Sequence, residues 1–150
     1  MVLAQHITYA TLLLLLILAT ITDLRERIIP DKVILLGTIV VLAVHLIFRI
    51  RPLWTYFLAG FGVLVLLLIM AVITGGRVIG GGDIKLFALI AFTVGFFAFI
   101  HIFVISHVVA AIFLVIVKLF RLKQWKLKDE IAFAPFMLLG TGVTYGLLLL

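Results

Sequence analysis

The stretch that decides the fold is GRVIGGGDIKLFALIAF, residues 76–92. It places Asp83 between three glycines and the beginning of a long apolar segment. An ionised carboxylate is costly at membrane depth, so its position beside an apolar run needs an explanation. The glycines need one too, because glycine permits backbone conformations closed to other residues and lets another segment approach closely.

The rest of the chain has the composition of a polytopic membrane protein. Of its 150 residues, 67% are hydrophobic, whereas soluble domains have about 45–50%. A helix needs about 20 apolar residues to cross ~30 Å of hydrocarbon. Runs near that length recur at about Leu3–Thr22, Val33–Phe48, Trp54–Ile73, Leu86–Val117 and Ile131–Leu150. We predict an all-α membrane protein with one domain, residues 1–150. Residues 1–22 lack Lys and Arg, unlike a cleaved secretory signal, so we expect this segment to be retained.

The basic residues decide how often the chain crosses. The run Leu86–Val117 has 32 uncharged residues, which is long for one helix and short for two. If it crosses twice, turning near Gly95, ten of the twelve Lys and Arg residues lie on one side and only Arg49 and Arg51 on the other. Cytoplasmic loops collect Lys and Arg. We therefore predict six transmembrane helices with basic loops in the cytoplasm and both termini outside, the fourth and fifth helices having about 15 residues each.

The net charge of +6 follows from this topology. Attraction to anionic lipid headgroups is a secondary interpretation, and we do not expect nucleic-acid binding.

Four of the six acidic residues have a structural explanation. Asp31 follows Pro30 at the start of the second predicted helix, and Asp129 and Glu130 begin the sixth. An anion at a helix N-terminus caps free N–H groups and is favoured by the helix dipole. Glu26 lies between two arginines in a loop, which indicates a solvated position.

Asp23 and Asp83 are the remaining pair. Asp23 falls at the C-terminal end of the first helix, where the dipole disfavours an anion; a salt bridge to Arg25 or Arg27 is its structural explanation. Asp83 could simply cap the fourth helix. Both lie at cytoplasmic helix ends, and two carboxylates brought close share a proton. Such a pair can hydrolyse a peptide bond, one carboxylate activating water as base and the other polarising the carbonyl as acid.

Three segments together resemble the type IV prepilin peptidases. TDLRERIIPDKV (22–33) is similar to the family's first-aspartate motif, D-x5-I-P, and GGGDIKLFA (80–88) matches its second, G-x-G-D-x-K-L. IAFAPFMLLG (131–140) resembles its sixth-helix segment. The resemblance implies that Asp23 and Asp83 are the catalytic pair of a membrane aspartic endopeptidase without a cofactor. It implies that the enzyme removes the basic leader of prepilin-like membrane proteins at the cytoplasmic face of the cell membrane.

The chain departs from the larger bacterial members of that family. Those carry an N-terminal methyltransferase region and a zinc-binding cysteine tetrad, whereas this sequence has no cysteine. It resembles the short, peptidase-only members of Flp-type pilus systems and of archaea. We therefore expect no methyltransferase activity.

Five further residues are candidates for shaping the site. Gly80 and Gly82 are expected to form the loop that presents Asp83. Lys85 matches the family motif, and its structural alternative is a lysine that extends to the membrane interface. Pro30 is expected to fix the start of the second helix, and Pro135 to kink the sixth.

The four histidines do not predict a metal site. His101 and His107 are six residues apart, not at the i,i+4 spacing of a helical ligand pair. We expect all four to be separate histidines at the membrane interface, with no bound metal.

Two other functions stay open. Carboxylates within apolar segments also occur in small proton-coupled transporters. A non-catalytic assembly factor of a pilus or secretion system is the second alternative.

Overall fold

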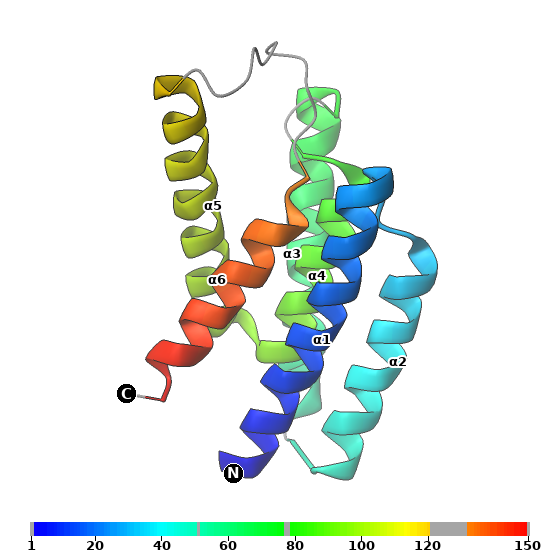
Figure 1. Cartoon of the computed structure of the whole chain (residues 1–150). Helices are drawn as coiled ribbons and strands as arrows, with labels where there is room; N and C mark the ends of the chain where they lie inside the picture. The colour runs from blue at the N-terminus through cyan, green and yellow to red at the C-terminus, as the bar shows by residue number, and fades with distance from the viewer. Residues whose placement is uncertain (1, 51, 77–78, 121–131, 150) are drawn as a thin grey trace.

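The computed structural model describes residues 2–50, 52–76, 79–120 and 132–149. Within them the protein is all-α, as predicted (Figure 1). The six helices are α1 (Val2–Glu26), α2 (Asp31–Ile47), α3 (Leu53–Thr74), α4 (Gly81–Val94), α5 (Phe96–Leu119) and α6 (Ala134–Leu147). By length and composition, three segments of the described chain can cross a membrane: Leu3–Glu26, Leu53–Thr74 and Phe96–Leu119.

The helices run alternately up and down, so that helix ends gather at two ends of the bundle. Figure 1 shows the two termini of the chain at one end. The C-terminal ends of α1, α3 and α5 and the N-terminal ends of α2, α4 and α6 lie toward the other. Asp23 in the last turn of α1 and Asp83 in the first turn of α4 therefore belong to the same end of the molecule.

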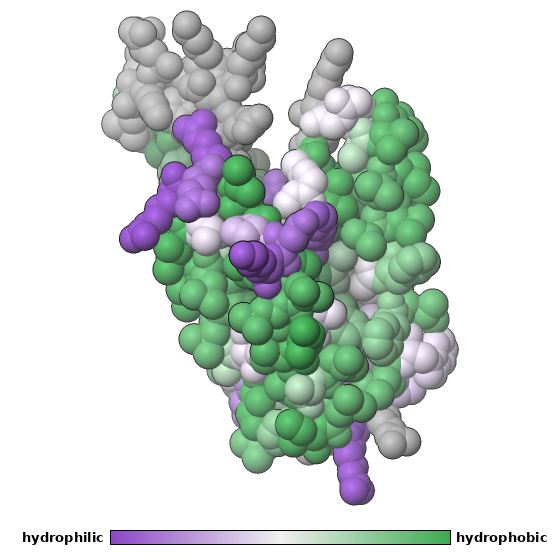
Figure 2. Space-filling view, turned by 90° about the vertical axis from the view of Figure 1, so that its right-hand side faces the viewer, coloured by the Kyte–Doolittle hydropathy of each residue, from purple (hydrophilic) through white to green (hydrophobic). Residues whose placement is uncertain are grey.

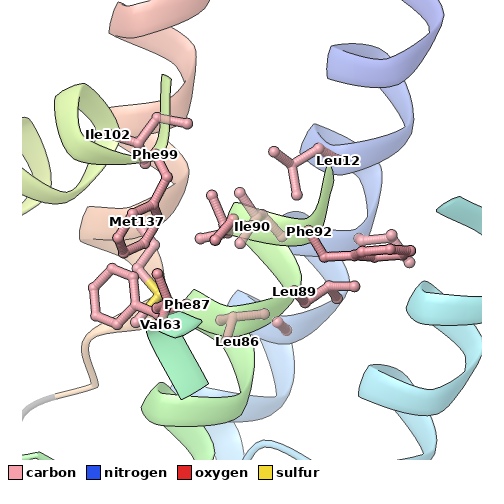
Figure 3. Packing of buried hydrophobic residues seen from close by; sticks show 14 of the residues in the cluster. Leu12, Val63, Leu86, Phe87, Leu89, Ile90, Phe92, Phe99, Ile102 and Met137 are labelled. Carbon is pink, nitrogen blue, oxygen red and sulfur yellow. The ribbon is translucent and has the colours of Figure 1, made fainter. Parts of the chain in front are cut away.

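The short helix α4 forms the centre of the core. Eight of its fourteen residues are buried, and it packs against α1, α2, α3 and α5. In Figure 3, Phe87 of α4 lies beside Phe99 and Met137, whereas Leu89 and Phe92 point to the opposite side. Because side chains leave α4 in all directions into protein, this helix is held on several sides by its neighbours.

The outer surface is apolar, as a lipid-facing surface must be. Large hydrophobic side chains are exposed on every helix, for example Leu35 at 64% and Ile73 at 78%. In Figure 2 apolar residues cover most of the visible face, and hydrophilic residues gather mainly in its upper half. The apolar surface and the three long helices mark the chain as a membrane protein.

The turn at Gly95 is confirmed, but the predicted equal lengths of the two helices it joins are wrong. Gly95 has φ +83°, a conformation that glycine adopts at little cost. It ends α4 after 14 residues and leaves 24 for α5. At 1.5 Å per residue, α4 is roughly 21 Å long and α5 roughly 36 Å. The N-terminal end of α4, with Asp83, is thus closer to the Gly95 turn than the C-terminal end of α5 is.

Close helix packing depends on Gly140 in α6. A Cβ at this position would lie 2.9 Å from the Ile102 carbonyl oxygen of α5 and would overlap Ser106 Oγ. Gly142, two residues later, has no atom of another element within 4 Å of such a Cβ. Small residues let membrane helices approach closely, and Gly140 performs that role between α5 and α6.

Candidate active site

Asp23 is a buried carboxylate at the junction of α1 and α6. Its exposed fraction is 6%. Asp23 Oδ2 accepts a hydrogen bond of 2.9 Å from the backbone N–H of Ala134, the first residue of α6. The predicted salt bridge to Arg25 or Arg27 is wrong, because the ion pair found among the described residues joins other side chains. The N-terminus of α6, which favours an anion, offsets the unfavourable C-terminus of α1.

Asp83 is the third residue of α4 and is partly buried. The N-cap of α4 is Gly80, and no side chain caps it. The Asp83 carboxylate lies beside Gly80, since a Cβ at that glycine would be 3.3 Å from Asp83 Oδ2. The capping that could have explained Asp83 is therefore not found, although its place in the first turn of α4 is one where the helix dipole favours an anion.

The two carboxylates lie within electrostatic reach of each other although 60 positions separate them. Asp83 lies outside the predicted apolar membrane run, which begins at Leu86. Burial, and in second place the Asp23 carboxylate, raise the pKa of Asp83 to about 7 against the opposing effect of the Gly80 N–H. At neutral pH the Asp83 carboxyl therefore exchanges its proton readily, next to a second carboxylate.

The glycines before Asp83 act through close approach. A Cβ at Gly82 would lie 3.1 Å from the Ile29 Cβ in the α1–α2 turn, whereas one at Gly81 would meet nothing within 4 Å. The expected special backbone conformation is wrong here, because none of the three glycines has a positive φ. Pro30 is the N-cap of α2 with φ −64°, which confirms that it fixes the start of that helix. The two aspartate motifs are thus in direct contact.

Lys85 is paired with an acid outside the carboxylate pair. Its Nζ forms an ion pair with Asp31 Oδ1, and both side chains are substantially exposed, at 46% and 77%. Asp31 lies in the first turn of α2, but no side chain caps that helix. The predicted capping role of Asp31 is therefore wrong, and the pair instead joins α4 to α2. Asp129 and Glu130, for which we also predicted capping, lie outside the described residues.

Pro135 is the second residue of α6, so the predicted kink is wrong. Proline fits the first turn of a helix because the N–H groups there have no partner within the helix. The proline thus begins α6 immediately after the amide that bonds Asp23. This amide could not be predicted from the Asp23 motif and the late Ala-Pro segment, because a backbone donor leaves no residue-type signal.

The histidines have separate partners. His6 bonds the Tyr145 hydroxyl at 2.7 Å, and His101 and His107 each bond a carbonyl of their own helix. His45 is fully buried, with Nε2 3.1 Å from a carbonyl oxygen of α4. The prediction of an interface position is therefore wrong for His45. In the described part of the chain, no group of three His, Cys, Asp or Glu side chains could hold a metal.

Comparisons with known proteins agree with the arrangement of the two motifs. Residues 10–116 match the type IV leader peptidase family. The prepilin peptidase EppA of Methanocaldococcus jannaschii is 30% identical over 154 residues, covering 93% of this chain and 40% of the relative. The prepilin leader peptidase/N-methyltransferase of Bacillus subtilis is 32% identical over 132 residues, covering 87% of this chain and 52% of the relative. The chain thus spans about half or less of the length of these curated relatives. No solved structure matches it significantly.

Proposed function

Since the chain belongs to the type IV leader peptidase family, we propose that it is a membrane aspartic endopeptidase whose catalytic pair is Asp23 and Asp83. Its substrates are prepilin-like membrane proteins, from which it removes a basic leader. The observation that carries the proposal is that both carboxylates lie at the same end of the bundle, where burial and, in second place, the Asp23 carboxylate raise the pKa of Asp83. Pairs of this kind share a proton and supply an acid and a base together.

The hydrolysis needs only water and the pair. The ionised carboxylate takes a proton from water as the hydroxide oxygen bonds to the scissile carbonyl carbon. The carbonyl oxygen takes the proton of the other carboxyl, which gives a neutral gem-diol. The amide nitrogen then accepts the first proton as the C–N bond breaks, and one gem-diol hydroxyl returns its proton to the second carboxyl. The products are a free acid and a free amine, and the pair returns to its initial state.

We place this chemistry at the cytoplasmic face of the cell membrane, in a bundle whose six helices are all embedded in the bilayer. Two features support that orientation. Arg25, Arg27, Lys32 and Lys85 belong to the same end of the bundle as the pair, and cytoplasmic loops collect Lys and Arg. Asp83 lies in the first turn of α4 and is only partly buried, so it is placed at the helix end that faces this side.

The deciding experiment is leader removal by asparagine variants. Asp23→Asn and Asp83→Asn should each abolish cleavage of a co-expressed prepilin, because asparagine cannot exchange a proton. The double variant should be no worse than either single one, since the pair acts as a unit. Asp31→Asn is the matched control: it removes an acid at a helix start near the site and should keep most activity. Substantial turnover by a well-inserted Asp83→Asn enzyme would refute the aspartic mechanism.

The product distinguishes a peptidase from a bifunctional enzyme. We propose that cleavage leaves an unmethylated amine on the mature pilin. The mass of the pilin N-terminus, measured after incubation with the purified chain and S-adenosylmethionine, tests this. A gain of one methyl group would reveal a second activity.

The two alternatives make different predictions. A proton-coupled transporter would move solute across vesicles, and Asp83→Asn would stop that movement without affecting any pilin. An assembly factor would support pilus formation equally well in wild type and in Asp83→Asn. The position of both carboxylates at one end of the bundle favours the peptidase, because a transport path must continue to the other end.

A further inference from the structure

We propose that the first amide of α6, the Ala134 N–H, decides which member of the catalytic pair is the base and which is the acid. It holds Asp23 as the ionised carboxylate that activates water. Asp83 is then the protonated carboxyl that polarises the scissile carbonyl. This assignment rests on the proposed function. It makes α6 a positioning element that acts through Asp23 without touching substrate.

Asp23 has a backbone donor that favours its charged form. The Ala134 N–H donates to Asp23 Oδ2 at 2.9 Å, and the bond is buried. A carboxylate that accepts backbone N–H bonds is stabilised as the anion. The donor is the first residue of α6, so the positive end of that helix dipole adds to the effect. Pro135 follows immediately and favours the helix start at this position.

The surroundings of Asp83 favour its neutral form. Its carboxyl is partly buried and has the ionised Asp23 as a neighbour. The Gly80 N–H opposes this effect but does not outweigh it. Once Asp23 is fixed as the anion, a second charge nearby is disfavoured. Asp83 therefore keeps the shared proton.

The other charged groups on the helices around Asp23 are exposed, apart from Asp83. The described residues of α6 carry none. The charged groups on α1, α2 and α4, together with the arginine that follows α1, are Arg25, Glu26, Arg27, Asp31, Lys32, Asp83 and Lys85. All of these except Asp83 are exposed, and Lys85 is paired with Asp31. On α5, the centroid of the His107 ring lies 4.9 Å from that of Phe133, the residue before Ala134. The test therefore includes a variant that lacks this imidazole.

The test is an amide-to-ester exchange at residue 134. Incorporating lactic acid in place of alanine in the full chain removes the N–H donor and keeps the methyl side chain. The acid limb of the pH profile of leader cleavage should move to higher pH by about one unit, because a hydrogen bond to a charged group is lost. An ester at Leu53, the first residue of α3, is the matched control and should leave the profile unchanged. His107→Phe removes the imidazole and should leave the ester effect intact.

Three outcomes would overturn the assignment: an acid limb that does not move, a shift confined to the alkaline limb, or inactivity of a normally folded ester variant at every pH. A second measurement does not depend on the variant. In wild type carrying ¹³C-labelled aspartate, the Asp83 carboxyl should keep its proton to higher pH than Asp23, and the reverse order refutes the proposal. Failure of the proposed function would look different, since Asp23→Asn or Asp83→Asn would then still cleave.

Discussion

Asp83→Asn should make the protein more stable at pH 8 while it abolishes activity. In the folded protein, burial and the Asp23 carboxylate raise the pKa of Asp83 from 3.8 to about 7. In the unfolded chain, Asp83 ionises at its ordinary value. Below pH 3.8 the carboxyl is neutral in both states and carries no penalty. As the pH rises from 3.8 to 7, unfolding releases a proton that the folded state retains, so stability falls.

The size of the effect follows from the same two values. One pKa unit corresponds to about 1.36 kcal/mol, so a shift from 3.8 to about 7 gives about 4 kcal/mol as an upper limit. Asparagine cannot ionise and avoids this cost. The stability gained by Asp83→Asn should be near zero at pH 3.5, grow up to pH 7 and stay constant above it.

The assay is reversible unfolding of the purified protein in mixed micelles at pH 3.5, 5, 6.5 and 8. Asp31→Asn is the control: its exposed ion pair with Lys85 is worth about 1 kcal/mol or less, and its effect should depend little on pH above 5. An Asp83→Asn protein that is less stable than wild type at pH 8, or a difference that is the same at pH 3.5 and 8, would refute the reasoning.

Glycine and lysine substitutions test the helix packing and the surroundings of the site. Gly140→Ala should lower stability by about 1–3 kcal/mol, because its Cβ overlaps α5, whereas Gly142→Ala should be neutral or slightly stabilising in thermal melts. Gly82→Ala should reduce leader cleavage more than Gly81→Ala at matched expression, since only the former pushes against the α1–α2 turn; equal activities would contradict this. Lys85→Met should change the melting temperature little and keep cleavage above half of wild type, because its ion pair is exposed and is made with Asp31; loss of cleavage without loss of stability would assign Lys85 to the substrate.

The parts of the fold that sequence could predict follow from strong composition signals. Apolar runs and the distribution of Lys and Arg predicted six helices and the turn at Gly95, because both depend on residue types alone. The unequal division between α4 and α5 was missed, since the run Leu86–Val117 was divided equally although the glycine that breaks it lies near its start. His45 was also misplaced: nothing in its neighbours indicates that its ring fills the core beside an α4 carbonyl group.

At the candidate site, the sequence predicted the two carboxylates but not the groups that contact them. Asp23 and Asp83 stood out because other acids had simpler explanations, although the explanation given for Asp31 was itself wrong. Its partner Lys85 is 54 positions away, and long-range pairing leaves no local signal. The prediction of a kink at Pro135 was wrong for a related reason. Whether a proline kinks a helix or begins it depends on where the helix starts, and α6 starts at Ala134.

The role of α6 shows why the two aspartate motifs are not a complete description of the site. The two aspartate motifs lie within residues 22–33 and 80–88, yet the hydrogen bond that holds Asp23 comes from Ala134. At the end of α1 alone, the helix dipole would disfavour the Asp23 anion. The N-terminus of α6 reverses that preference, and the carboxylate so fixed then acts on Asp83. The proton of the pair is therefore positioned by three helix ends, one of which contributes no ionisable group.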